Sequence, residues 1–132
     1  MIFDKKVEEV LKNAEAEAKG SPYGTPHVML ALTETKDFAS AYTGDYDKLK
    51  SYLKYCKSTY KESGISSENR GKDLAITLDV IIPSVYDMTK ELKTKDTIIL
   101  AHLFLALCAK SRCLDLPTYF DSIGIDKMEV FK

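Results

Sequence analysis

Apolar residues recur at every third or fourth position along most of the chain, which is the spacing of one face of an α-helix. Between residues 4 and 18, valine, leucine and alanine form such a stripe, while charged residues such as Glu8 and Lys12 take the opposite side. The run Gly20-Ser21-Pro22 follows, and glycine and proline commonly end a helix. The pattern predicts an amphipathic helix that packs one face against a core.

Two other segments, 28–32 and 98–109, are apolar on all sides. Thr25 suits the N-cap of the first one, and Pro26 suits the first helical position because its missing N–H would have no partner there. A helix with no polar face has to be covered by other elements. Both segments are therefore predicted to be short, buried helices.

Further helices are predicted over 45–61, from Pro83 to about Leu92, and after Pro117, with Asp126 capping a last one. The polar, glycine-containing stretch 63–73 is predicted to be a linker, and 76–82 is the one ambiguous apolar run. No alternation of the β type extends over a useful length. The fold class predicted from these patterns is all-α.

An internal repeat with an offset of 75 residues organises the chain. Residues 27–32 read His-Val-Met-Leu-Ala-Leu, and residues 102–107 read His-Leu-Phe-Leu-Ala-Leu. We expect one domain over 1–132, with repeat one at about 1–62, a linker at about 63–74 and repeat two at about 75–132. The predicted architecture is a pseudo-twofold bundle of two four-helix repeats, about eight helices in all. The same offset pairs Phe3 with Leu78, Val7 with Ile82, Val10 with Val85 and Tyr23 with Ile98.

Composition limits the class of protein and the cellular compartment that we expect for this chain. The chain has 132 residues with 19 basic and 20 acidic side chains, so the net charge of −1 excludes a polybasic arm or an acidic tail as its main feature. No apolar run approaches the roughly 20 residues that span a bilayer, and Met1–Asp4 does not open a signal peptide. The cysteine count is three, an odd number that favours reduced thiols. We expect a cytoplasmic protein.

The residues that carry most enzyme chemistry are not grouped in recognisable motifs. There are two histidines, and Cys108 and Cys113 do not have the spacing of a zinc site. Gly64 and Gly71-Lys72 resemble a phosphate loop, but six residues separate the glycines, and Asp73 follows where Ser or Thr is needed. We expect no catalysis, no metal and no cofactor. The histidines are expected to hydrogen-bond neighbouring backbone in the first turn of a buried helix.

Several of these motifs occur together in one known family. Phe3, then Val10-Leu11-x-x-Ala14, then Thr25-Pro26-His27 with its apolar helix follow one another, and Phe120 to Met128 contains Ile123-Gly124-Ile125-Asp126. This order resembles the N-terminal domain of Clp-type AAA+ unfoldases, a double repeat of four helices per half. The resemblance covers nearly the whole chain.

The resemblance implies a domain that docks substrate or adaptor proteins for an unfoldase and buries a peptide or helix in an apolar groove between the repeats. It implies protein partners without membrane or nucleic acid, and a monomeric isolated domain. The glutamates that hold phosphoarginine in one branch of the family are replaced by Pro26 and Ala101, so that ligand is not expected. Mapped by motif position, the partner-binding candidates are Phe3, Asp4, Val85, Met88, Thr89 and His102.

An alternative rests on a lysine stripe, defined as Lys50, Lys54, Lys57 and Lys61, with tyrosines interleaved. Such a stripe fits a free-standing interaction protein or a nucleic-acid binder. Glu62 and Asp45–Asp47 flank it, so a solvated helix face is the simpler interpretation.

Overall fold

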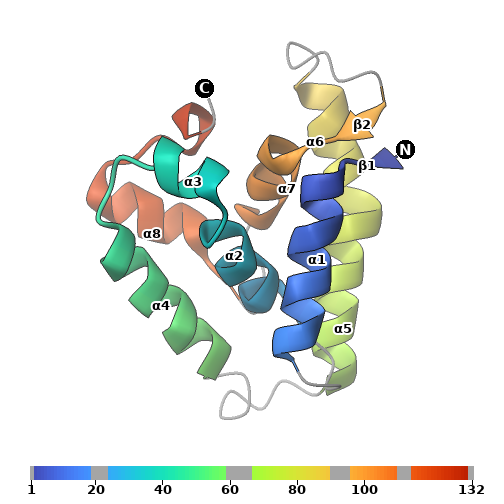
Figure 1. Cartoon of the computed structure of the whole chain (residues 1–132), viewed down its shortest axis with the longest axis horizontal. Helices are drawn as coiled ribbons and strands as arrows, with labels where there is room; N and C mark the ends of the chain where they lie inside the picture. The colour runs from blue at the N-terminus through green and yellow to red at the C-terminus, as the bar shows by residue number, and fades with distance from the viewer. Residues whose placement is uncertain (1, 19–23, 59–66, 90–95, 110–113, 131–132) are drawn as a thin grey trace.

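The structure is a computed structural model that describes residues 2–18, 24–58, 67–89, 96–109 and 114–130, with side chains from Lys72 onward in the third range. These residues are mostly helical, and this confirms the all-α class (Figure 1). The described part also contains one short parallel ladder, in which Ile2 pairs with Thr97 and Phe3 with Ile98. Two residues per strand are too few to produce an alternating pattern, so periodicity could not predict this ladder.

The described residues of the first half form a short strand and four helices; three of these helices match predicted segments, whereas β1 and α3 do not. Asp4 is the N-cap of the first helix, where its carboxylate accepts a hydrogen bond from the Lys6 N–H at 3.4 Å. The predicted stripe of that helix is buried at Val7, Val10 and Ala14. The elements are β1 (Ile2–Phe3), α1 (Lys5–Glu17), α2 (Thr25–Thr33), α3 (Lys36–Ala41) and α4 (Tyr46–Ser58).

The second half opens with a continuous helical run. The predicted linker at 63–74 is helical from Ser67 onward, and its earlier part lies outside the described residues. The polar sequence predicts a loop there, but a helix that exposes one side tolerates many polar residues. The elements are α5 (Ser67–Ile76), the π-helix η1 (Thr77–Ile81), α6 (Ile82–Met88), β2 (Thr97–Ile98), α7 (Leu100–Leu107), α8 (Leu116–Ile123) and the 3-10 helix η3 (Lys127–Glu129).

Pro83 lies in the first turn of α6, as predicted, but α6 continues directly from η1 instead of following a loop. Proline has no N–H, and its ring clashes with the carbonyl four residues earlier, here Asp79. The backbone widens just before it, where the Ile82 N–H donates to the Thr77 carbonyl, five residues back. This π turn lets the run pass the proline, and it explains why 76–82 looked ambiguous in the sequence.

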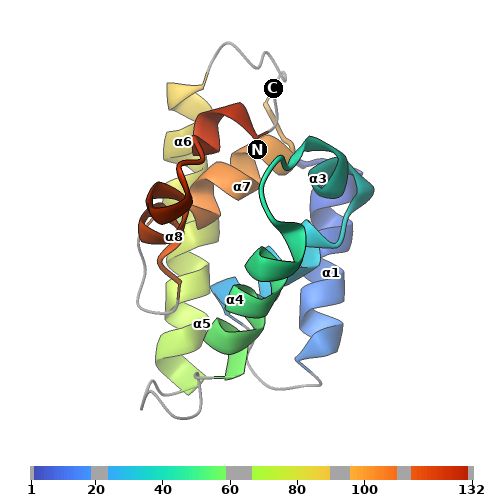
Figure 2. The ribbon, with the colours of Figure 1, turned by 90° about the vertical axis from the view of Figure 1, so that its left-hand side faces the viewer.

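The two all-apolar helices form the centre of the molecule. α2 packs against α1, α4 and α7, and α7 also packs against α6 and η1. α1 and α5 overlap in Figure 1 but lie on opposite sides in Figure 2, with α2 and α7 between them. The predicted burial of both helices is confirmed: Val28, Met29, Leu32 and Leu103 are fully buried.

Aromatic rings join the centre to one outer helix of each half. Phe104 on α7 lies 5.7 Å from Phe38 on α3 and 5.9 Å from Phe120 on α8, measured between ring centroids. The loop before α4 reaches the same region at Gly44, where an added Cβ would lie 2.5 Å from the Ile125 side chain. Glycine therefore allows a close approach there.

Replacement of Phe104 by alanine should lower the free energy of unfolding by about 3–5 kcal/mol, because a large cavity would open between three helices. Urea denaturation followed by circular dichroism measures this loss. The control is Tyr55→Ala, since Tyr55 is 66% exposed on α4 and its removal should change stability by less than about 0.5 kcal/mol. Equal effects of the two substitutions would contradict the assignment of the core.

Candidate functional site

The two histidines of the repeat occupy equivalent positions and make the same contact. The Gly24 N–H donates to Nδ1 of His27 at 3.2 Å, and the Ile99 N–H donates to Nδ1 of His102 at 3.0 Å. Each imidazole thus caps the first turn of its own helix, α2 or α7, as a glutamate or glutamine does in a capping box. The expectation that the histidines bond neighbouring backbone is confirmed. α2 begins one residue earlier than predicted, and the Thr25 hydroxyl donates to the Asp73 carboxylate instead of capping.

His102 is completely buried. Its ring lies 5.3 Å from the ring of Tyr86, between centroids, and its Nε2 has no hydrogen-bond partner. Burial lowers the pKa of His102, because a charged imidazolium would lose its hydration there. A neutral ring whose Nδ1 accepts a hydrogen bond carries its proton on Nε2. His102 is thus held as a structural group without access to solvent.

Contacts between the two halves gather the predicted candidates at one end of the molecule. Asp4 follows β1, and its N–H donates to the Ile98 carbonyl at 2.8 Å. The Tyr86 hydroxyl on α6 accepts from the Asp96 N–H at 2.6 Å, just before β2. α6, β1, β2 and the start of α7 therefore meet there.

The six candidates differ in exposure. Met88 is 81% exposed, and Phe3 and Val85 are half-buried against the core. Thr89 is buried, and its hydroxyl donates to the Val85 carbonyl at 2.7 Å. Thr89 and His102 thus lie beneath the surface, which explains why motif position alone could not identify contact residues. We call the set Phe3, Val85 and Met88 the terminal patch.

Exposed apolar residues also occur outside the predicted candidates, and three of them lie on β1 or on the helical run that ends at Met88. Ile2 on β1 is 69% exposed, Ile76 is 53% exposed and Val80 is 59% exposed. Val80 and Ile76 lie on the solvent side of the same helical run as Met88, about two and three helical turns before it. The signal was present in the ambiguous stretch 76–82, which is apolar on both of its faces.

The lysine stripe follows α4 for part of its length. Lys50 lies over the Tyr46 ring, 5.5 Å from its centroid, and the Lys57 ammonium lies 3.8 Å from the Glu17 carboxylate. Lys54 is exposed, and Lys61 lies outside the described residues. Both contacts are of the weak, solvated kind.

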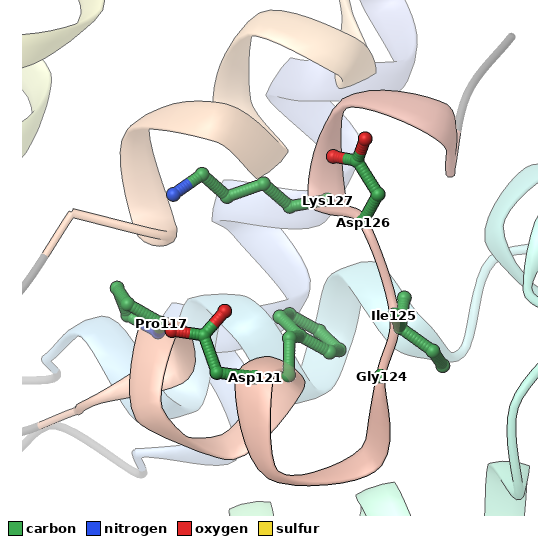
Figure 3. A pocket seen from close by; sticks show the side chains of 7 residues that line it. Pro117, Asp121, Gly124, Ile125, Asp126 and Lys127 are labelled. Atoms are coloured by element: carbon green, nitrogen blue, oxygen red, sulfur yellow. The ribbon is translucent and has the colours of Figure 1, made fainter.

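A pocket of about 330 Å³ lies between α8 and η3 (Figure 3). The buried Phe120 is among its lining residues, and the side chains of Asp121 and Lys127 border it. Its lining residues lie near the C-terminal end of the sequence. In Figure 1, α8 and η3 lie on the opposite side of the molecule from α5 and α6. The pocket therefore does not belong to the terminal patch. Its lining residues are Pro117, Phe120, Asp121, Gly124, Ile125, Asp126 and Lys127.

Reactive groups are sparse in the described part of the chain. No three His, Cys, Asp or Glu side chains come together there as a metal site would require. Burial raises the pKa of the Cys108 thiol to about 12, so this cysteine stays protonated. Within the same residues, no helix has the length and apolar character needed to cross a membrane.

Comparison of the chain with protein-family models, with curated proteins and with solved structures finds no match. Function therefore has to be argued from the residues and their geometry.

The stability of the protein should fall in mild acid because of His102. Its ordinary pKa is 6.5, and burial lowers that pKa in the folded state, so the unfolded chain binds the proton more readily. The free energy of unfolding should hold above about pH 6.5 and decline as the pH falls below it. Urea denaturation between about pH 7.5 and 5.5 measures the change.

His102→Gln is the matched variant, because glutamine at this position can still accept the Ile99 N–H but does not titrate. The variant should show a smaller loss of stability over the same pH range. An identical pH dependence in the two proteins would exclude His102 as its source.

Proposed function

We propose that this chain is a docking domain of the Clp-unfoldase type, which binds a short peptide or helix of a substrate or adaptor protein. The proposed fold is the pseudo-twofold double repeat, with α1–α4 as one repeat and the elements from α5 to η3 as the other. The histidine caps support this pairing, because they lie 75 residues apart and make the same contact at the start of matching helices.

The observation that carries the function is the terminal patch. Apolar side chains that remain exposed side by side are typical of protein-binding surfaces. Here Met88 is exposed one helical turn from the half-buried Val85 on α6, and the half-buried Phe3 lies on β1, where β1 of the first half pairs with β2 of the second. Methionine adapts its shape to different partners, which suits a docking surface.

The six predicted residues divide into two roles under this proposal. Phe3, Val85 and Met88 would contact the partner. The other three would hold the elements of the terminal patch in place. Asp4 caps α1, Thr89 bonds the backbone of α6, and His102 caps α7.

The chain itself is proposed to act without catalysis, as a cytoplasmic, monomeric domain whose partners are proteins. Phosphoarginine is not among the proposed ligands, because Pro26 and Ala101 offer no carboxylate to a guanidinium. Both residues are also buried.

The second candidate is binding through the lysine stripe. The exposed Lys54 beside the exposed Tyr55 favours it, since a cation next to an aromatic ring is a common feature of nucleic-acid and protein contacts. The two candidates predict opposite responses to salt, because apolar burial changes little with ionic strength whereas lysine contacts weaken steeply.

Val85→Glu combined with Met88→Glu should reduce capture of partner proteins by the immobilised chain about tenfold or more, since a charge would have to be buried in the contact. Lys54→Glu combined with Lys57→Glu should have a much smaller effect. Capture is measured from about 50 to about 500 mM salt, a range that spans weak to strong screening. Circular dichroism confirms that both variants are folded.

The proposal fails if the lysine variant abolishes capture while the folded terminal-patch variant binds normally. That outcome, together with steep salt dependence, would assign binding to the stripe.

A further inference from the structure

The solvent side of the run α5–η1–α6 carries a row of residues spaced by four. We call Ile76, Val80, Ser84 and Met88 the outer row; all four are exposed. The row spans 12 helical steps, or about 18 Å at 1.5 Å per residue. In Figures 1 and 2 this run lies at a border of the molecule, and no other described helix covers its outer side.

The inner side of the same run already provides the core contacts. Leu74, Thr77 and Ile82 are buried there, and Val85 packs against the core. The outer row is thus not needed to anchor the run. Three large apolar side chains in water along one ridge are unusual for a solvent-facing helix, which normally presents polar residues.

The spacing of the row determines what fits it. Side chains at every fourth position form a ridge that packs into the groove between the ridges of a second helix. Ser84, the smallest member, leaves a gap between Val80 and Met88 into which a partner side chain can insert. An α-helix with its own apolar ridge is the matching shape.

Two acidic residues lie one position N-terminal to members of the outer row. Asp79 and Asp87 are exposed beside Val80 and Met88, and neither forms an ion pair with the described residues. Of the described side chains on this face, Lys72 alone is basic, and it lies at the far N-terminal end. Next to an apolar ridge, these two carboxylates favour a partner that brings positive charge to the edge of the contact.

We propose that the outer row binds an amphipathic α-helix of a partner protein, whose apolar ridge is flanked by lysine or arginine. This inference rests on the proposed docking function and names the chemistry of the partner. It adds Ile76 and Val80, with Asp79 and Asp87, to a surface of which only Met88 was expected.

The test uses three synthetic helices of about 16 residues, long enough to span the row. The first has leucines at every fourth position flanked by lysines, the second has glutamates in place of the lysines, and the third keeps the lysines but has serines in place of the leucines. Binding to the full chain is measured by fluorescence anisotropy. The lysine-flanked apolar helix should bind at least about tenfold more tightly than either of the others.

Two variants identify the surface. Val80→Glu should weaken binding of the first helix about tenfold or more, whereas the matched control Tyr55→Glu, an exposed apolar residue on α4, should leave it unchanged. Reversal of charge with Asp79→Lys and Asp87→Lys should shift the preference to the glutamate-flanked helix. Both changes are at exposed positions, and circular dichroism checks that the variants are folded.

Equal binding of the lysine and glutamate helices, or of the leucine and serine helices, would overturn the inference. So would a Val80→Glu variant that binds normally. A concentration-dependent dimer, seen by analytical ultracentrifugation and lost in Val80→Glu, would assign the row to a second copy of the chain instead. If partner capture depends on Val85 and Met88 but not on Val80, the docking function stands and only this inference falls.

Discussion

Burial of two helices that have no polar face is the constraint on which the rest of the structure depends. α2 and α7 expose apolar side chains in every direction, so each must be surrounded by other elements. α1, α4 and α6 supply the cover with one apolar stripe each, and α2 and α7 contact one another. Any other arrangement of the amphipathic helices would leave α2 or α7 exposed to water.

A helix that begins inside a core brings N–H groups that must find acceptors away from water. Here a histidine solves the problem at both buried N-termini, through Nδ1 of His27 and of His102. The solution requires a neutral ring, and burial of His102 keeps it neutral. The two equivalent histidines thus belong to the architecture of the fold. The same arrangement fixes the start of α7, and with it the strand β2 and the end of α6.

Periodicity predicted the helical class, the stripe of α1 and the burial of α2 and α7, because these depend on local spacing alone. It could not predict the β1–β2 ladder, which joins Phe3 to Ile98 across most of the chain and is only two residues long. The candidate residues were predicted to share a surface, but their exposure depends on tertiary packing. Met88 and Thr89 are neighbours in sequence, but Met88 is exposed whereas Thr89 is buried.

The run from α5 to α6 carries two apolar faces, and only one of them is used for folding. Its inner face covers α7 through residues such as Ile82. Ile76 and Val80 lie on the outer face, where they are exposed. The π turn before Pro83 keeps the run continuous, so both faces extend past the proline to Met88. Because the two sets of side chains do not overlap, substitutions on the outer face can change binding while the fold persists. Because folding and binding use different sides of one helical run, mutations in the outer row can change binding without disturbing the core.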